Sequence, residues 1–157
     1  MNRDVQRSAV YAAEDQWTAI LDRGGTVDFF GSVLTIVPQR RFGDLDAVRT
    51  YVEHVCTGNG LAVPEVRAHR GHSRAHYSSA TSTISIPWNL SGRSTGWAAR
   101  ESVVLHEIAH HWAFQSATTL LHDTHYVGAM IRLVASTLGE EAALLLRAGY
   151  DGVGVRG

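Results

Sequence analysis

The chain has 157 residues, of which 45% are hydrophobic, and a formal net charge of −1. Its length and composition predict one globular domain over residues 1–157, and the near-neutral charge counts against a surface for nucleic acid or acidic membranes. A single cysteine, Cys56, excludes an internal disulfide bond, and because no leader-like segment and no apolar run of membrane-spanning length is visible, we expect a cytoplasmic protein.

Hydrophobic periodicity predicts the elements of the first half of the chain. A helix is expected over residues 4–21, and β-branched residues predict a strand over residues 32–37. Asp44 or Asp46 can cap a second helix that runs to Cys56. Three short strands are expected after this helix, over residues 65–69, 74–77 and 81–87.

Three helices are expected in the second half. One begins near Trp97, the next covers residues 122–138 and the last covers residues 140–148. The tail, residues 151–157, is expected to be loose. This order of elements predicts an α+β domain, with a small mixed sheet of about three to four strands packed against helices.

The most informative motif is His106-Glu107-Ile108-Ala109-His110, a His-Glu-x-x-His pattern within an apolar helical stretch. Residues four apart lie on one face of a helix, so His106 and His110 can direct two imidazoles at one metal ion. Glu107 would then be close enough to hold a water molecule. Two ligands and a general base on one turn are typical of zinc hydrolases. Two core histidines satisfied by ordinary hydrogen bonds are the alternative interpretation.

Catalytic zinc usually has a third protein ligand. The metzincin pattern would require Gly at position 113 and His at position 116, and because this chain has Ala113 and Ser116, that class is excluded. Glu140 and Glu141 would suit a thermolysin-like ligand, but they look like first-turn acids of the last helix.

His122 and His125 are the better candidates for the third ligand, because a short turn and a returning helix would bring either one back to the metal. The segment also resembles the SprT-like and WLM-type small metallopeptidases, a gluzincin-like group. In their pattern the first histidine of this segment is the third ligand. The resemblance therefore implies His122 as ligand, with Asp123 at the small or polar position and Tyr126 at the aromatic position.

The whole chain is also similar to a family of small metallohydrolases found in actinobacteria and their phages. This resemblance covers four segments: the opening stretch Arg3–Asp15, Thr83–Pro87, the motif helix and Glu141–Leu145. Many relatives have Gly-Pro after the third histidine, where this chain has Asp123-Thr124. The resemblance implies a compact zincin-like domain that binds one Zn²⁺ per chain and acts on a peptide or protein.

The predicted activity is therefore that of a zinc-dependent metallopeptidase. Water activated by zinc would attack a carbonyl group while Glu107 takes its proton and returns it to the leaving amine. An extended substrate could add to the strand Thr83–Ile86, for which a plain sheet strand is the alternative. No nucleic-acid or membrane partner is expected. The alternative function is a regulatory or interaction protein that keeps zinc mainly for structure, with little turnover.

Other polar residues are candidates for supporting roles. Asp123 is preferred to Glu101 as an acid that orients a ligand imidazole, although capping the following helix competes for Asp123. His111 is assigned no role. Four side chains could support a developing oxyanion, each with a structural role as its alternative: His76, Tyr77, His125 and Tyr126.

Two further patterns are interpreted as structural. The stretch Gly92–Gly96 matches Gly-x-Ser-x-Gly, but the chain lacks the repeated βα units of an α/β-hydrolase, so Ser94 or Thr95 is expected to cap the metal helix instead. The histidine-rich stretch His69–His76 is interpreted as a polar hairpin tip, because its interleaved arginines would repel a cation.

Overall fold

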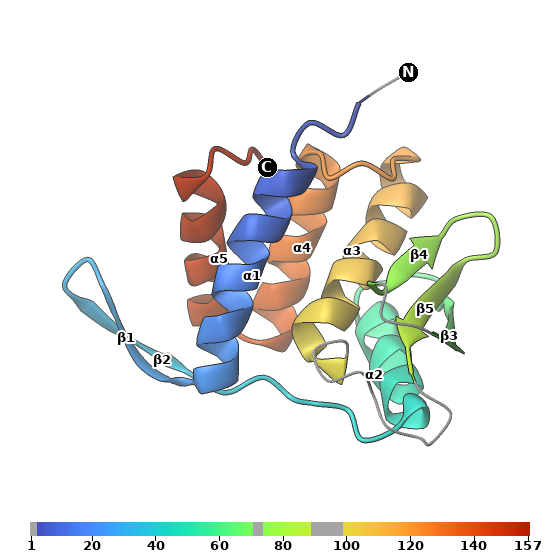
Figure 1. The fold of residues 1–157 in the computed structure, drawn as a ribbon, viewed down its shortest axis with the longest axis horizontal. Helices are drawn as coiled ribbons and strands as arrows, with labels where there is room; N and C mark the ends of the chain where they lie inside the picture. The colour runs from blue at the N-terminus through green and yellow to red at the C-terminus, as the bar shows by residue number, and fades with distance from the viewer. Residues whose placement is uncertain (1–2, 71–73, 89–98) are drawn as a thin grey trace. The chain divides into compact units, whose positions relative to one another are not determined.

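The computed structural model describes residues 3–70, 74–88 and 99–157 (Figure 1). The chain forms two compact units: unit 1 contains Met1–Gln39 with Thr119–Gly157, and unit 2 contains Arg40–Thr118. The described ranges hold five helices and two small sheets, which confirms the predicted α+β class. None of the described helices combines the length and apolar character needed to cross a lipid bilayer.

Three helices build unit 1: α1 (Arg7–Arg23), α4 (Thr124–Thr137) and α5 (Glu140–Gly152). Helix α5 contacts both α1 and α4 (Figure 1). The buried positions of α1 recur every three or four residues, as expected for a helix with one apolar face. Its largest buried side chain, Trp17, donates a hydrogen bond from Nε1 to the Ala142 carbonyl 3.0 Å away, which joins α1 to α5.

A buried carboxylate lies in the core of unit 1. Glu14 is only 6% exposed, and its Oε2 accepts hydrogen bonds from the hydroxyls of Tyr126 and Tyr150, each 2.8 Å away. Burial, together with the neighbouring Glu14 carboxylate, raises the pKa of the Tyr150 hydroxyl well above its usual value. The hydrogen bonds from the two phenols therefore replace those to water that the carboxylate loses when it is buried.

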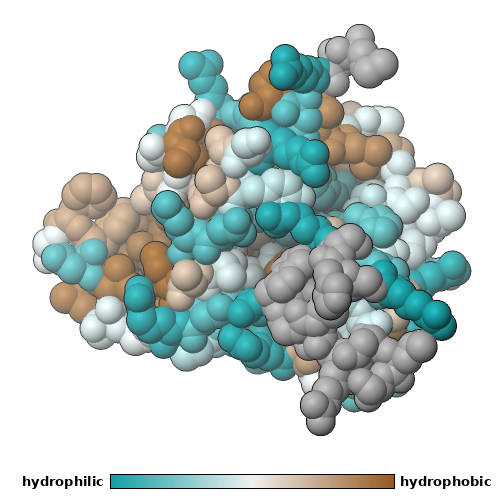
Figure 2. All heavy atoms as spheres, viewed as in Figure 1, coloured by the Kyte–Doolittle hydropathy of each residue, from teal (hydrophilic) through white to brown (hydrophobic). Residues whose placement is uncertain are grey.

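Unit 1 also carries an antiparallel hairpin of β1 (Gly25–Phe29) and β2 (Ser32–Ile36). The strand β2 was predicted and β1 was not. A two-residue turn joins them, with φ of 52° at Phe30 and 85° at Gly31, as in the mirror-image turns that fit the twist of a hairpin. Three apolar side chains at and beyond this turn are well exposed: Phe30, Val33 and Val37. Figure 2 shows brown, apolar surface at the end where Figure 1 places β1 and β2.

The end of the chain is packed, which differs from the expected loose tail. Helix α5 extends to Gly152, four residues beyond the predicted end. Val155 is 4% exposed and its backbone N–H donates to the Tyr150 carbonyl 2.9 Å away. The backbone N–H of Arg156 donates to Oε1 of Gln6 at 2.8 Å.

Unit 2 begins with α2 (Leu45–Gly58), which Asp44 caps by accepting a hydrogen bond from the Ala47 N–H at 2.7 Å. This confirms the first of the two predicted capping residues. Three strands follow: β3 (Glu65–His69), β4 (His76–Ser78) and β5 (Thr83–Pro87). Helix α2 contacts β3, and helix α3 (Glu101–Ala117) contacts β4 and α2.

The strand β5 is the central strand of this sheet, whose order is β3-β5-β4. It pairs in parallel with β3 along its whole length and antiparallel with β4 at Thr83, Ile84 and Ser85. An extended substrate therefore cannot add to Thr83–Ile86 as predicted, because three of these four residues already have a neighbouring strand on both sides. Ile84 and Ile86 are fully buried, which agrees with a central strand.

Candidate metal centre

Helix α3 carries the His-Glu-x-x-His motif, as predicted, but it begins at Glu101 with Arg100 as its N-cap residue. The predicted cap by Ser94 or Thr95, which lie outside the described residues, is therefore wrong. The Glu101 carboxylate lies in the first turn of α3 and is 4% exposed. It accepts hydrogen bonds from the backbone N–H of Arg40 at 2.5 Å and from the Tyr51 hydroxyl at 2.8 Å. These contacts give Glu101 a structural role at the start of the helix.

The three motif residues with polar side chains belong to unit 2, and all three are buried. His106, Glu107 and His110 are 5, 4 and 8% exposed. The rings of His106 and His110 have centroids 4.9 Å apart, as their i, i+4 spacing on α3 requires. Oε1 of Glu107 lies 3.9 Å from Nε2 of His106, so the carboxylate is close to a nitrogen that can bind a metal.

His122 belongs to unit 1 and lies in the turn before α4, not in the helix where it was predicted. Its ring Nδ1 is 2.8 Å from Oδ2 of Asp4. An ionised carboxylate only accepts hydrogen bonds, so Nδ1 carries the proton and Nε2 has a lone pair for a metal. Sequence analysis missed Asp4, since nothing local relates residues 118 positions apart.

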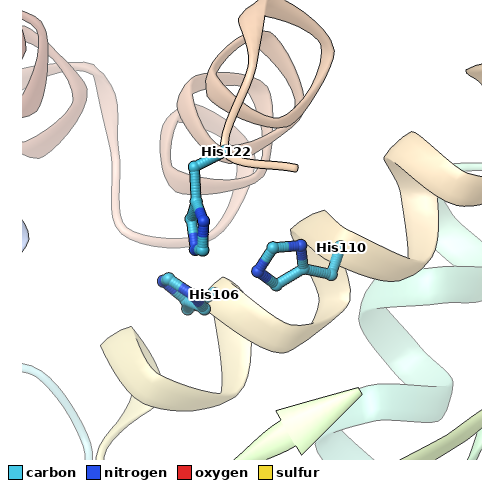
Figure 3. Close-up of side chains that lie close together, drawn as sticks. All are labelled: His106, His110 and His122. Atoms are coloured by element: carbon cyan, nitrogen blue, oxygen red, sulfur yellow. The ribbon is translucent and has the colours of Figure 1, made fainter. Parts of the chain in front are cut away.

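His106, His110 and His122 form a group that could hold a metal ion, since their ligand atoms all lie within 4.8 Å of one another. Figure 3 shows the three rings turned toward one another. Nitrogens on one tetrahedral zinc lie about 3.4 Å apart, because each Zn–N bond is about 2.1 Å long. Three buried imidazoles suit zinc and other borderline divalent metals, so the donor set fits the predicted ion without identifying it.

The other candidate ligands do not belong to this group. The side chain of His125 is 58% exposed and its Nδ1 lies 3.8 Å from Asp123. Glu140 and Glu141 are first-turn acids of α5, as the sequence indicated, and Glu141 accepts a hydrogen bond from the backbone N–H of Thr35. Asp123 is the N-cap of α4, accepting from the backbone N–H groups of His125 and Tyr126. The capping role proposed for Asp123 is thus confirmed.

The two tyrosines that could stabilise an oxyanion donate their hydroxyl protons to other side chains. The hydroxyl of Tyr126 donates to Glu14, and Tyr126 is fully buried. The hydroxyl of Tyr77 is 2.9 Å from Nδ1 of His111. A phenol has one proton to donate, so neither hydroxyl is available to a substrate in this arrangement.

His111 has a structural role that the sequence did not reveal. It is fully buried, and its Nε2 is 2.7 Å from the carbonyl of Ala62. A carbonyl only accepts, so Nε2 carries the proton and Nδ1 accepts from Tyr77. Burial lowers the pKa of His111, and the hydrogen bond to Ala62 opposes this effect less strongly. The neutral ring thus joins α3 to the strand β4 and to the segment after α2.

In the part of the chain that the structure describes, the remaining patterns contribute no second group of metal-binding side chains. Gly92–Gly96 lies outside the described residues. The stretch His69–His76 is not a hairpin tip, because the strands β3 and β4 that it connects lie on opposite sides of β5. The rings of His69 and His76 have centroids 5.3 Å apart.

No family model matches the chain, no curated protein matches its sequence, and no solved structure matches its fold. The resemblance to SprT-like and WLM-type metallopeptidases and to the small actinobacterial and phage metallohydrolases therefore stays a prediction.

Proposed function

We propose that this protein is a zinc-dependent hydrolase, and more specifically a metallopeptidase that cleaves an amide bond. The observation that carries the proposal is the group of three buried histidines with the Glu107 carboxylate beside it. Catalytic zinc sites have three protein ligands and an open position, whereas structural zinc sites have four protein ligands. Within the described ranges the group has three members. This count favours catalysis over a purely structural ion.

Different residues of the chain would bind the metal and transfer the proton. His106, His110 and His122 would hold the ion through neutral imidazole nitrogens. When bound, zinc would polarise a carbonyl group and lower the pKa of a water molecule toward about 7. Glu107 would accept the proton of the attacking water and return it to the leaving amine. A carboxylate that is 4% exposed is costly to bury, and a catalytic role gives a reason for its position.

The position of β4 favours an extended peptide as the substrate. This strand lies at one end of the order β3-β5-β4 and contacts α3, the helix that carries His106 and His110. No other strand of the described ranges pairs with its outer edge. An extended peptide can add to such an edge through backbone hydrogen bonds, with its carbonyl groups near α3. The expected substrate strand thus moves from β5 to β4.

Metal content and turnover test this proposal together. The purified protein should contain about one zinc per chain and should cleave members of a mixed set of fluorescence-quenched peptides. Glu107→Gln should keep the zinc and lose at least about 100-fold in turnover, because general base catalysis contributes about 10²–10⁴. A chain that binds no stoichiometric metal, or a Glu107→Gln variant with full activity, would overturn the proposal.

Glu101→Gln is the matched control. It makes the same change on the same helix, but the Glu101 carboxylate contacts Arg40 and Tyr51 rather than the metal ligands. Its turnover should stay within a few-fold of the wild-type value. If zinc raises the thermal stability but no peptide is cleaved, the regulatory or interaction role with a structural zinc is supported instead.

A further inference from the structure

His122 lies on a stretch of chain that regular secondary structure does not fix. The segment between α3 and α4 contains no helix or strand, and α4 begins two residues after His122, at Thr124. His106 and His110 differ from it, because the backbone of α3 holds both. A ligand outside a helix needs other contacts to keep its ring in place.

Asp4 supplies two of these contacts within unit 1. Its Oδ1 accepts a hydrogen bond from the backbone N–H of His122 at 3.0 Å, and its Oδ2 accepts from the ring Nδ1 at 2.8 Å. One carboxylate thus fixes both the main chain and the ring of His122. The side chain of Asp4 is 23% exposed, so solvent competes only partly for it.

Gln6 also bonds to His122, and it contacts Arg156 as well. Its Nε2 donates to the His122 carbonyl at 3.0 Å and to the Arg156 carbonyl at 3.2 Å, and its Oε1 accepts from the Arg156 N–H. The backbone N–H and carbonyl of His122 are therefore both bonded to side chains of residues 4–6. The same glutamine joins that segment to the C-terminal tail.

Two aromatic rings flank the imidazole. The centroids of Tyr11 in α1 and Tyr126 in α4 lie 5.2 and 4.9 Å from that of His122. These rings restrict where the imidazole can tilt, and Asp4 determines which nitrogen is protonated. The hydrogen bond at Nδ1 leaves Nε2 as the nitrogen for a metal.

We propose that residues Asp4–Gln6 are the positioning element for His122, so that metal affinity depends on the contacts of Asp4 and Gln6 and, through Gln6, on Arg156. Asp4 is a positioning residue that acts through His122, and Gln6 couples the C-terminal tail to the same ligand. The proposal rests on the metal site of the proposed function. Partners of this kind typically change metal affinity about 10–100-fold.

Zinc affinity, measured by competition with a chromophoric chelator, tests the proposal without any substrate. Asp4→Asn replaces one acceptor oxygen by an NH₂ group that faces a donor of His122, and it should weaken zinc binding about 10–100-fold. Asp123→Asn is the matched control, because Asn caps a helix about as well as Asp and Asp123 has no bond to the His122 ring. Its zinc affinity should stay within about three-fold of wild type.

A double-mutant cycle separates positioning from a general loss of folding. In a His122→Ala background, Asp4→Asn should have no further effect on zinc affinity, whereas an effect on folding would persist there. Gln6→Met, which keeps the length of the side chain without its polar atoms, should weaken zinc binding about five-fold, the worth of about one hydrogen bond. Circular dichroism of each metal-free variant checks that it is folded.

The outcomes distinguish this proposal from the proposed function. If the wild-type chain binds no zinc, the metal site itself is wrong. If the wild type binds zinc and Asp4→Asn binds it equally tightly, the positioning role is overturned while the metal site stands. An equal loss of affinity in Asp4→Asn with and without His122 would also overturn it.

Discussion

The hydroxyl of Tyr77 donates a hydrogen bond to Nδ1 of His111, 2.9 Å away, inside unit 2. His111 follows His110 directly on α3, about 100° further around the helix. One helix therefore presents two kinds of histidine. His106 and His110 belong to the group that could hold a metal ion, whereas His111 holds the helix to the strand β4.

Tyr77→Phe should destabilise the protein by about 1–3 kcal/mol. The substitution keeps the ring but leaves Nδ1 of His111 without its donor, and His111 is fully buried. Chemical denaturation followed by circular dichroism measures this loss. In a His111→Leu background the same substitution should cost much less, because the acceptor is already gone. Equal costs in the two backgrounds would show that the hydrogen bond contributes nothing.

Zinc stoichiometry should distinguish His122 from His125. His122→Ala removes one of the three proposed ligands and should lower zinc affinity by at least about 100-fold, whereas His125→Ala should keep about one zinc per chain. The side chain of His125 is 58% exposed and lies outside the histidine group, which is the reason for the difference. Elemental analysis after dialysis measures both variants. Zinc lost from His125→Ala and kept by His122→Ala would reverse the ligand assignment.

The features that were predicted correctly depend on local sequence. The motif helix, the Asp44 cap and the strand β5 all follow from spacing or from residue type over a few positions. The strand β1 was missed because Gly25 and Asp28 weaken its strand pattern, and it is stabilised by pairing with β2.

The features that were not predicted depend on distant pairs. Asp4 and His122 are 118 residues apart, and Tyr77 and His111 are 34 apart. No local pattern indicates either pair. The order β3-β5-β4 likewise depends on pairing in space, so the sequence could not show that β5 is central rather than at an edge. A single sequence thus indicated the three histidines that could hold a metal ion, but not Asp4, which bonds to His122.

Cys56 should be nearly unreactive in the folded protein. It is fully buried in α2, and burial raises the pKa of its thiol from 9.0 to about 11, which lowers the thiolate fraction at pH 8 about 100-fold. Labelling with a neutral disulfide reagent at pH 8 should therefore be more than about 100-fold slower in the native protein than in denaturant. Cys56→Ser should give no signal at all, since the chain has one cysteine. Rapid native labelling would show that α2 opens to solvent.

Tyr150 should make the protein less stable at alkaline pH. Its hydroxyl donates to Glu14, and burial beside that carboxylate raises its pKa well above 10. Above about pH 10 the phenol of the unfolded chain loses its proton while the folded chain keeps it. The folded state then binds more protons, so the free energy of unfolding falls as the pH rises.

A comparison of Tyr150→Phe with its parent measures this effect, with both chains in a Cys56→Ser background so that no thiol ionises. At pH 8 the phenylalanine variant should be less stable by about 1 kcal/mol, because it lacks the hydrogen bond to Glu14. Denaturant unfolding at pH 8, 10 and 11 should show this difference shrinking as the pH rises. Only the parent has the buried phenol of Tyr150, which stays protonated in the folded state and ionises on unfolding, so only the parent loses stability for this reason. A difference that stays constant from pH 8 to 11 would mean that Tyr150 ionises as easily in the folded protein as in the unfolded chain.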